Sequence, residues 1–148
     1  MPGVAEISRY LFLAGALPFL VLGLAHALAT PLGVEEAKGL SPRDLAVRKA
    51  MQQDSVMLTR RTNVWLAWVG FNLSHSLGAV LFGVVVVLVG RSQATFDTEA
   101  SVFLPFAAVV ASAYLILGIR FWFKTPIIGI ILSGACFAVS WVLFLLHG

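Results

Sequence analysis

The side chains best placed to do chemistry in this 148-residue sequence are two histidines embedded in apolar runs, His26 and His75. Near neutral pH an imidazole can exchange a proton, bind a metal or make hydrogen bonds. With 3.6 residues per turn, His75 falls on one helical stripe that is polar at its centre. The other members of that stripe are Trp65, Trp68, Asn72, Ser76, Ala79 and Gly83.

Other apolar runs carry polar side chains at a similar depth. At about 1.5 Å per residue, Tyr114 lies about 9 Å before Arg120, and Ser133 lies about 10 Å after Pro126. We therefore predict one polar layer near one end of the apolar runs, with Arg120 at its rim. Its members are His26, Asn72, His75, Ser76, Tyr114 and Ser133.

Three roles are open to this layer. Polar side chains join helices inside membranes at about 0.6 kcal/mol per hydrogen bond, so the layer can be structural. Ionisable groups inside a membrane are also candidates for function, which leaves open a site for a lipid, quinone or similar amphiphile. In that role Arg120 would bind a phosphate or carboxylate. His26 and His75 are in addition candidate metal ligands, as the axial pair of a haem.

Acid–base catalysis is not indicated. All seven Asp and Glu residues lie outside the long apolar runs, which removes a di-iron carboxylate site and most proton-transfer chemistry. The single cysteine, Cys136, has no base beside it and is interpreted as a buried inert thiol. We expect no catalytic residue and no cofactor.

Composition explains why these residues need a membrane frame. The chain is 59% hydrophobic and 11% charged, with a mean hydropathy of +0.94, whereas soluble domains are about 45–50% apolar and about 25% charged. Runs of about 20 apolar residues span a bilayer. We predict an all-α, four-helix transmembrane bundle in one domain, with spans at about 10–29, 64–90, 102–119 and 126–146.

Local signals refine these elements. Ser101 and Thr125-Pro126 are predicted to start the third and fourth spans. In the connection 30–63, Ser41-Pro42-Arg43-Asp44 is a capping box that predicts a helix running on through Met57. Opposite the polar stripe, the 64–90 helix carries small residues at Gly70, Ser74 and Gly78. Because small residues let helices approach closely, we expect this helix to contact neighbours on both faces.

The basic residues predict an orientation. Eight of the ten lie in connections that share one side, namely Lys38, Arg43, Arg48, Lys49, Arg60, Arg61, Arg120 and Lys124. The positive-inside rule makes that side cytoplasmic and places both termini outside. Ala27-Leu28-Ala29 also fits a signal-peptide cleavage site, but cleavage would leave the basic connection outside, against the same rule. The expected partners are the lipid bilayer and either a membrane protein or further copies of the chain, not nucleic acid.

Short motifs carry a family resemblance. With Gly23-Leu24-Ala25-His26 in the first span, Arg60-Arg61-Thr62, Trp65 and the stretch from Gly70 to Gly78 resemble a group of small uncharacterised four-helix bacterial membrane proteins. The resemblance implies a multi-pass protein of the bacterial inner membrane and transfers no activity. The first functional hypothesis is a non-catalytic scaffold or accessory subunit. Its alternatives are amphiphile binding in the polar layer and bis-histidine haem binding.

Overall fold

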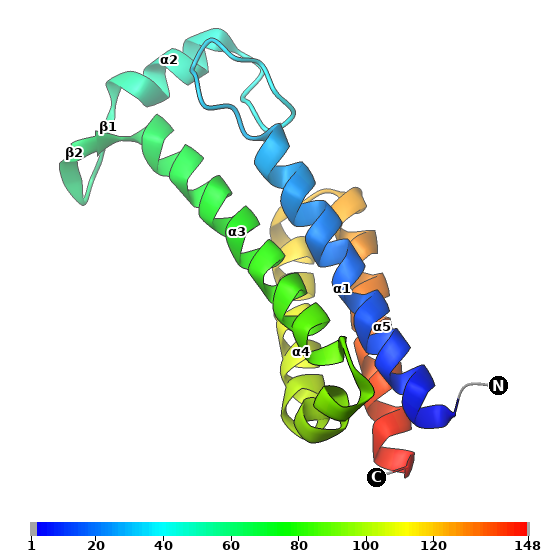
Figure 1. The fold of residues 1–148 in the computed structure, drawn as a ribbon. Coiled ribbons are helices and arrows are strands. Elements are labelled where there is room, and N and C mark those ends of the chain that lie inside the picture. Colours follow the sequence, from blue (N-terminus) through cyan, green and yellow to red (C-terminus); the bar gives the residue numbers. More distant parts are fainter. Residues whose placement is uncertain (1–2, 148) are drawn as a thin grey trace. The chain divides into compact units, whose positions relative to one another are not determined.

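The computed structural model describes residues 3–147 and confirms an all-α membrane fold (Figure 1). Four helices are long and apolar enough to cross a bilayer. The elements are α1 (Val4–Ala29), α2 (Leu45–Gln53), β1 (Ser55–Val56), β2 (Thr59–Asn63), α3 (Val64–Gly90), α4 (Gln93–Phe121) and α5 (Lys124–His147). They form two compact units, and α1 and α3 each contribute one segment to both.

The first unit, residues 1–22 and 80–148, is here called the four-helix unit. Its core is aromatic: the ring of Phe137 lies 5.8 Å from that of Phe12, 6.5 Å from Phe19 and 6.0 Å from Phe82. Gly15 faces Phe137 so closely that an added Cβ would overlap the ring. Because glycine has no side chain, α1 and α5 approach each other at this point.

Serines join the same two helices further along. The hydroxyl of Ser8 donates to the carbonyl of Ser140 at 2.8 Å, and the hydroxyl of Ser140 donates to the carbonyl of Ser8 at 2.7 Å. Arg9 reaches from α1 to the carbonyl of Gly90 at 2.9 Å and to Gln93 at 3.0 Å. Each of these bonds joins two helices, as expected where no water can satisfy polar groups.

The second unit, residues 23–79, is here called the polar unit. It contains the end of α1, the connection, α2, the β1–β2 hairpin and the first half of α3. Asp44 caps α2 by accepting from the Ala46 N–H at 2.8 Å. Val64 N–H donates to the Asp54 carbonyl at 2.9 Å, so the base of the hairpin is bonded to the start of α3.

The prediction of a helix through Met57 is wrong. Helix α2 ends at Gln53, and Asp54 takes an extended conformation that opens the antiparallel hairpin. The β-branched residues of the following segment, Val56, Thr59 and Thr62, favour strand over helix.

The predicted helix starts also differ, except that of α3. Helix α1 begins at Val4, six residues before the predicted span, and α2 begins at Leu45 with Asp44, not Ser41, as its cap. Helix α4 begins nine residues before the predicted span, at Gln93 with Ser92 as its cap, and Ser101 lies exposed within it. Its first turns contain Asp97 and Glu99, so a prediction based on uncharged runs begins the helix only after these residues. Helix α5 begins at Lys124, two residues before Pro126. Helix α3 has the predicted bounds, because its apolar run has polar residues at both ends.

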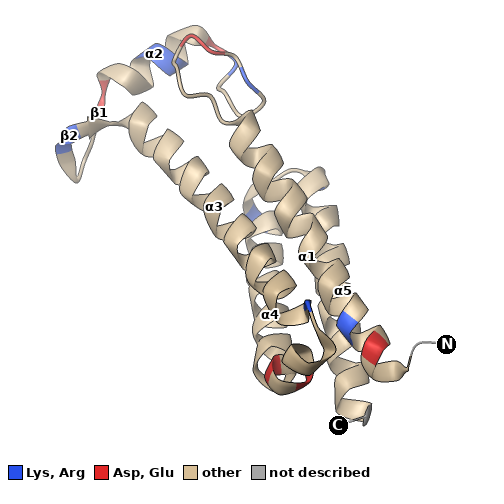
Figure 2. Ribbon diagram, viewed as in Figure 1, with Lys and Arg blue, Asp and Glu red and all other residues tan. Residues whose placement is uncertain are grey.

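The small-residue face of α3 is exposed, so the prediction of neighbours on both faces is wrong. Gly70, Ser74 and Gly78 are all exposed, and a Cβ added at Gly70 would meet nothing within 4 Å. The opposite face is buried at Trp65, Val69, Asn72, Ser76 and Ala79. Charged residues occur in the connections and near helix ends, away from the middle of the long helices (Figure 2).

Candidate polar site in the α1–α3 pair

A chain of hydrogen bonds joins α1 to α3 in the polar unit. His26 Nε2 lies 2.9 Å from Asn72 Oδ1, and Asn72 Nδ2 donates to the backbone carbonyl of Trp68 at 2.8 Å. Only the Nδ2 end of the amide can donate to a carbonyl, so Oδ1 must face the histidine. His26 Nε2 therefore carries the hydrogen and donates it to Asn72.

The buried polar side chains of this hydrogen-bonded chain, Asn72 and Ser76, all have partners within it. Asn72 is 7% exposed and holds one partner at each end of its amide. Ser76, 2% exposed, donates to the carbonyl of Asn72 at 3.0 Å. A buried polar group without a partner costs about 1–3 kcal/mol, and these bonds avoid that cost. The arrangement holds α1 against α3 at one register.

His75 flanks this chain of hydrogen bonds beside His26. Its ring centroid is 5.1 Å from that of His26 at an interplanar angle of 58°, and 6.3 Å from Phe71 at 16°. Both histidines are half-buried, whereas Phe71 is exposed. The two imidazoles thus form a ring pair that is partly open at the surface of the polar unit.

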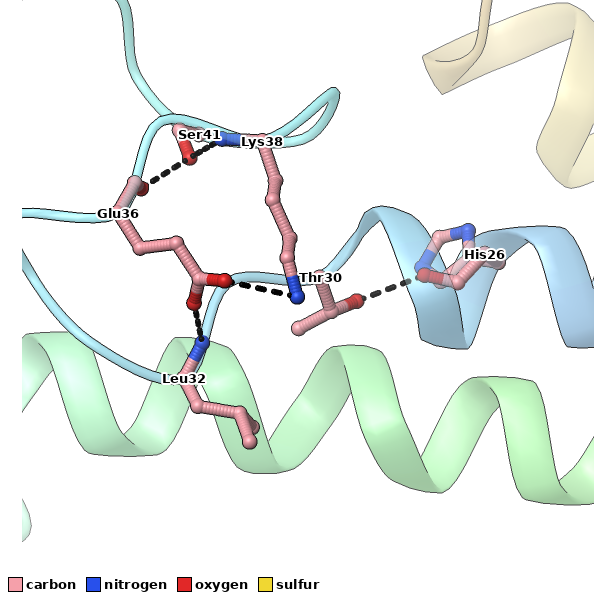
Figure 3. A network of polar contacts seen from close by, with 6 residues as sticks. All are labelled: His26, Thr30, Leu32, Glu36, Lys38 and Ser41. Atoms are coloured by element: carbon pink, nitrogen blue, oxygen red, sulfur yellow. Dashed lines mark hydrogen bonds and ion pairs between the residues drawn. The ribbon is translucent and has the colours of Figure 1, made fainter.

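The end of α1 is fixed by a second network in the connection (Figure 3). Thr30 donates to the carbonyl of His26 at 2.9 Å. Glu36 accepts from the Leu32 N–H at 3.0 Å and pairs with Lys38 at 2.9 Å. Together the Lys38 side chain and the Leu32 N–H lower the pKa of Glu36 below its ordinary value of 4.5. The Ser41 hydroxyl donates to the Glu36 carbonyl at 3.1 Å and accepts from the Lys38 N–H.

The other predicted members of the polar layer have their contacts in the four-helix unit. Ser133 is fully buried and donates to the Gly15 carbonyl at 2.8 Å. The half-buried ring of Tyr114 packs edge-on against Phe19 at 5.3 Å and against Trp122 at 6.0 Å. Arg120 is exposed in the last turn of α4. The structure therefore gathers four of the predicted residues, His26, Asn72, His75 and Ser76, in one unit.

The histidine pair does not have the geometry of a bis-histidine haem. Metal–nitrogen bonds of about 2 Å on opposite faces of one metal separate the two nitrogens by about 4 Å and the ring centroids by about 6 Å. The observed 5.1 Å leaves too little room for a macrocycle between the rings, and His26 Nε2 is bonded to Asn72. Among the described side chains, no group of three His, Cys, Asp or Glu residues is placed to hold a metal.

Several polar contacts were missed at the sequence level. The last acceptor in the hydrogen-bonded chain that starts at His26 is the backbone carbonyl of Trp68. Every residue has such a carbonyl, so the residue types in the sequence do not indicate which one is used. The Ser8–Ser140 pair has a signal, since serines in apolar helices bond to neighbouring backbones, but the pairing needs the fold. The β1–β2 hairpin was missed because the capping box at residues 41–44 favoured a helix that continued through this segment.

No family model, no curated protein and no solved structure matches this chain. The interpretation of the site therefore rests on its geometry.

Proposed function

We propose that this multi-pass membrane protein is a non-catalytic scaffold or accessory subunit of a membrane complex, and that its polar layer serves as helix-joining structure. The observation that carries the proposal is the chain from His26 through Asn72 to the Trp68 carbonyl. Nε2 of His26 and both ends of the Asn72 amide, which could otherwise act on a substrate, are bonded to the protein itself. Ser133, bonded to the carbonyl of Gly15, follows the same pattern in the four-helix unit.

The proposal includes a setting. The resemblance of its short motifs favours the bacterial inner membrane. Six of the ten Lys and Arg residues lie in the connection between α1 and α3, and two more lie where α4 meets α5, on the same side of four alternating spans. The positive-inside rule then makes that side cytoplasmic and both termini periplasmic.

Labelling tests this orientation. Cys136 is replaced by serine, and one new cysteine is placed in the connection at Gly33 or in the turn between α3 and α4 at Arg91. A membrane-impermeant maleimide applied to intact cells should label the Arg91 position and leave the Gly33 position unlabelled until the cells are permeabilised. The reverse pattern would invert the proposed orientation.

Native purification with mass spectrometry of retained proteins and small molecules tests the scaffold role. We expect a protein partner at fixed stoichiometry, or a defined homo-oligomer, and no stoichiometric small molecule. His75→Leu and Asn72→Leu should lower the melting temperature in detergent without changing the co-purified lipids. A monomer that retains neither a partner nor a second copy would contradict the scaffold proposal.

Amphiphile binding is the second candidate, because the His26–His75 ring pair is only half-buried and lies beside the exposed Phe71. An imidazole N–H can donate to a headgroup or quinone oxygen in exchange for its present contact. This candidate predicts one small molecule retained per chain by the wild type and lost in His75→Leu. Ser74→Ala, on the opposite and exposed face of α3, is the matched control and should retain it.

A further inference from the structure

The closed end of the β1–β2 hairpin presents two large apolar side chains that touch nothing in the described chain. Met57 is 105% exposed and Leu58 is 95% exposed. The next most exposed large hydrophobic residue is Leu28, at 76% and inside a spanning helix. Met57 and Leu58 instead lie in a connection, where soluble surfaces usually carry polar residues.

The turn itself does not explain the choice of these residues. Val56 pairs with Thr59, so Met57 and Leu58 are the two residues that connect the strands. Two-residue hairpin turns favour Asn-Gly or Gly-containing pairs with positive φ, and no residue in the described chain has positive φ. Methionine and leucine therefore serve neither turn geometry nor packing here. Such a departure from local rules points to a role outside the fold.

The hairpin is held close to a spanning helix. Strand β2 ends at Asn63 and α3 begins at the next residue, Val64, whose N–H bonds to the Asp54 carbonyl at the hairpin's base. At about 3.3 Å per residue, the closed end is no more than about 20 Å from the start of α3. Figure 1 shows the hairpin folded to the side of the first turn of α3 instead of continuing beyond it.

The charges beside this tip have one sign. Arg60 and Arg61 follow Leu58 by two and three residues and are both exposed. The segment from 55 to 63 contains no acidic residue. The ion pairs in the described chain join Lys38 to Glu36 and Lys49 to Glu35, which leaves both hairpin arginines without a carboxylate partner. Two unpaired guanidinium groups next to an apolar tip complement an anionic membrane surface.

We propose that the β1–β2 hairpin is an interfacial anchor, in which Met57 and Leu58 enter the outer acyl region of the bilayer that contains α3. Arg60 and Arg61 bind anionic phospholipid headgroups at the same surface. The anchor fixes the connection to the membrane beside the polar site and makes its position depend on lipid charge. The anchor uses residues outside the polar layer, so a test of the anchor is independent of the proposed scaffold role.

Fluorescence in lipid nanodiscs tests the anchor on the full chain. In a Cys136→Ser background, Leu58→Cys carries an environment-sensitive label, and Gly33→Cys carries the same label on an exposed turn of the connection. Nanodiscs contain phosphatidylcholine alone or with phosphatidylglycerol, and nitroxide lipids serve as quenchers. We expect blue-shifted emission and strong quenching at position 58 in anionic nanodiscs, with water-like emission at position 33.

Charge variants separate the two halves of the anchor. Arg60→Gln and Arg61→Gln should each lower the ratio of inserted to free tip by about fivefold in anionic nanodiscs. In phosphatidylcholine alone these variants should have little effect. Met57→Ser should reduce quenching at position 58 in both lipids. Melting temperatures should match the wild type in all variants, because the substituted side chains are exposed.

Three results would overturn the proposal. Water-like emission at position 58 in both lipids would place the tip in the aqueous phase. Quenching that is equal in both lipids and indifferent to the arginines would remove headgroup binding. Shielding of the label in native membranes but not in nanodiscs would identify a protein, and not the lipid surface, as the occupant.

Discussion

The two units of this chain handle polar groups inside apolar helices in different ways. In the four-helix unit Ser8, Ser133 and Ser140 are completely buried, and each hydroxyl bonds to a backbone carbonyl of another helix. In the polar unit Ser76 bonds only to a carbonyl of its own helix, and α1 is joined to α3 by two side chains, the half-buried imidazole of His26 and the buried amide of Asn72. A hydroxyl can bond to any backbone carbonyl within reach, whereas the His26–Asn72 bond requires two particular side chains. The joint between helices in the polar unit therefore depends more strongly on residue type than the joints in the four-helix unit.

The same contrast appears in the aromatic residues. Phe12, Phe19 and Phe137 are at most 1% exposed and pack as one cluster in the four-helix unit. In the polar unit Phe71 is 68% exposed and stacks on the half-buried ring of His75. We infer that tight ring packing specifies the four-helix unit and that hydrogen bonds specify the polar unit. The following substitutions test that inference.

Phe137→Ala should have the largest effect. The ring is fully buried among Phe12, Phe19 and Phe82, and removing a buried phenylalanine costs about 3–5 kcal/mol through lost contacts and the cavity left behind. Unfolding in mixed micelles titrated with dodecyl sulfate measures the free energy. Phe71→Ala is the matched control and should cost less than about 1 kcal/mol, because most exposed positions change stability little. Equal losses would remove the distinction between the units.

Gly15→Ala should cause the next largest loss of stability. The added methyl would overlap the Phe137 ring, and that ring cannot move without disturbing the cluster. Overpacking of this kind costs about 1–3 kcal/mol. Gly70→Ala, with nothing within 4 Å of its Cβ, should be neutral or stabilising by up to about 1 kcal/mol, since alanine favours helix. The same detergent titration measures both. A loss at Gly70 as large as that at Gly15 would show that the exposed face is covered in the intact protein.

Sequence reasoning was accurate where one physical signal dominates. Helix α3 was bounded correctly because an uncharged run meets polar residues at both ends. The start of α4 was placed too late because Asp97 and Glu99 interrupt apolarity without interrupting the helix, which buries Phe96 and Ala100 on its other side. The grouping of His26 with Asn72 was predicted from their similar depth along the spans and from the helical period. The bond from Ser133 to Gly15 could not be predicted in this way, because the depth of a side chain does not show which neighbouring helix it faces.

A double-mutant cycle tests the hydrogen bond that joins α1 to α3. Asn72→Leu and His26→Leu should each destabilise the protein, and their coupling should be about 0.6 kcal/mol and at most about 1.7 kcal/mol, as found for interhelical hydrogen bonds in membranes. The detergent titration supplies all four free energies. Ser74→Ala serves as the control partner: its hydroxyl bonds to the Phe71 carbonyl on the exposed side of α3, so its effect should add to that of His26→Leu. Coupling no larger than in this control pair would count against the His26–Asn72 bond as the joint.

The smallest effect is a pH dependence of the connection after α1. The bonds from Lys38 and Leu32 hold the pKa of Glu36 below 4.5 in the folded protein. A lowered carboxyl pKa contributes stability that is present above the unfolded pKa and is lost as pH falls through the folded value. The connection should therefore open on acidification below 4.5 and stay closed at neutral pH.

Hydrogen exchange at the Leu32 amide, whose hydrogen bonds to Glu36, reports this opening directly. After correction for the intrinsic rate, protection in the wild type should stay constant from neutral pH down to 4.5 and fall below that pH. In Glu36→Gln the carboxylate is gone, so protection should be lower at neutral pH and change little on acidification. Because the group is exposed, the melting temperature should be unaffected. If the variant kept the acid-dependent loss of protection, a group other than the Glu36 carboxylate would have to hold this connection.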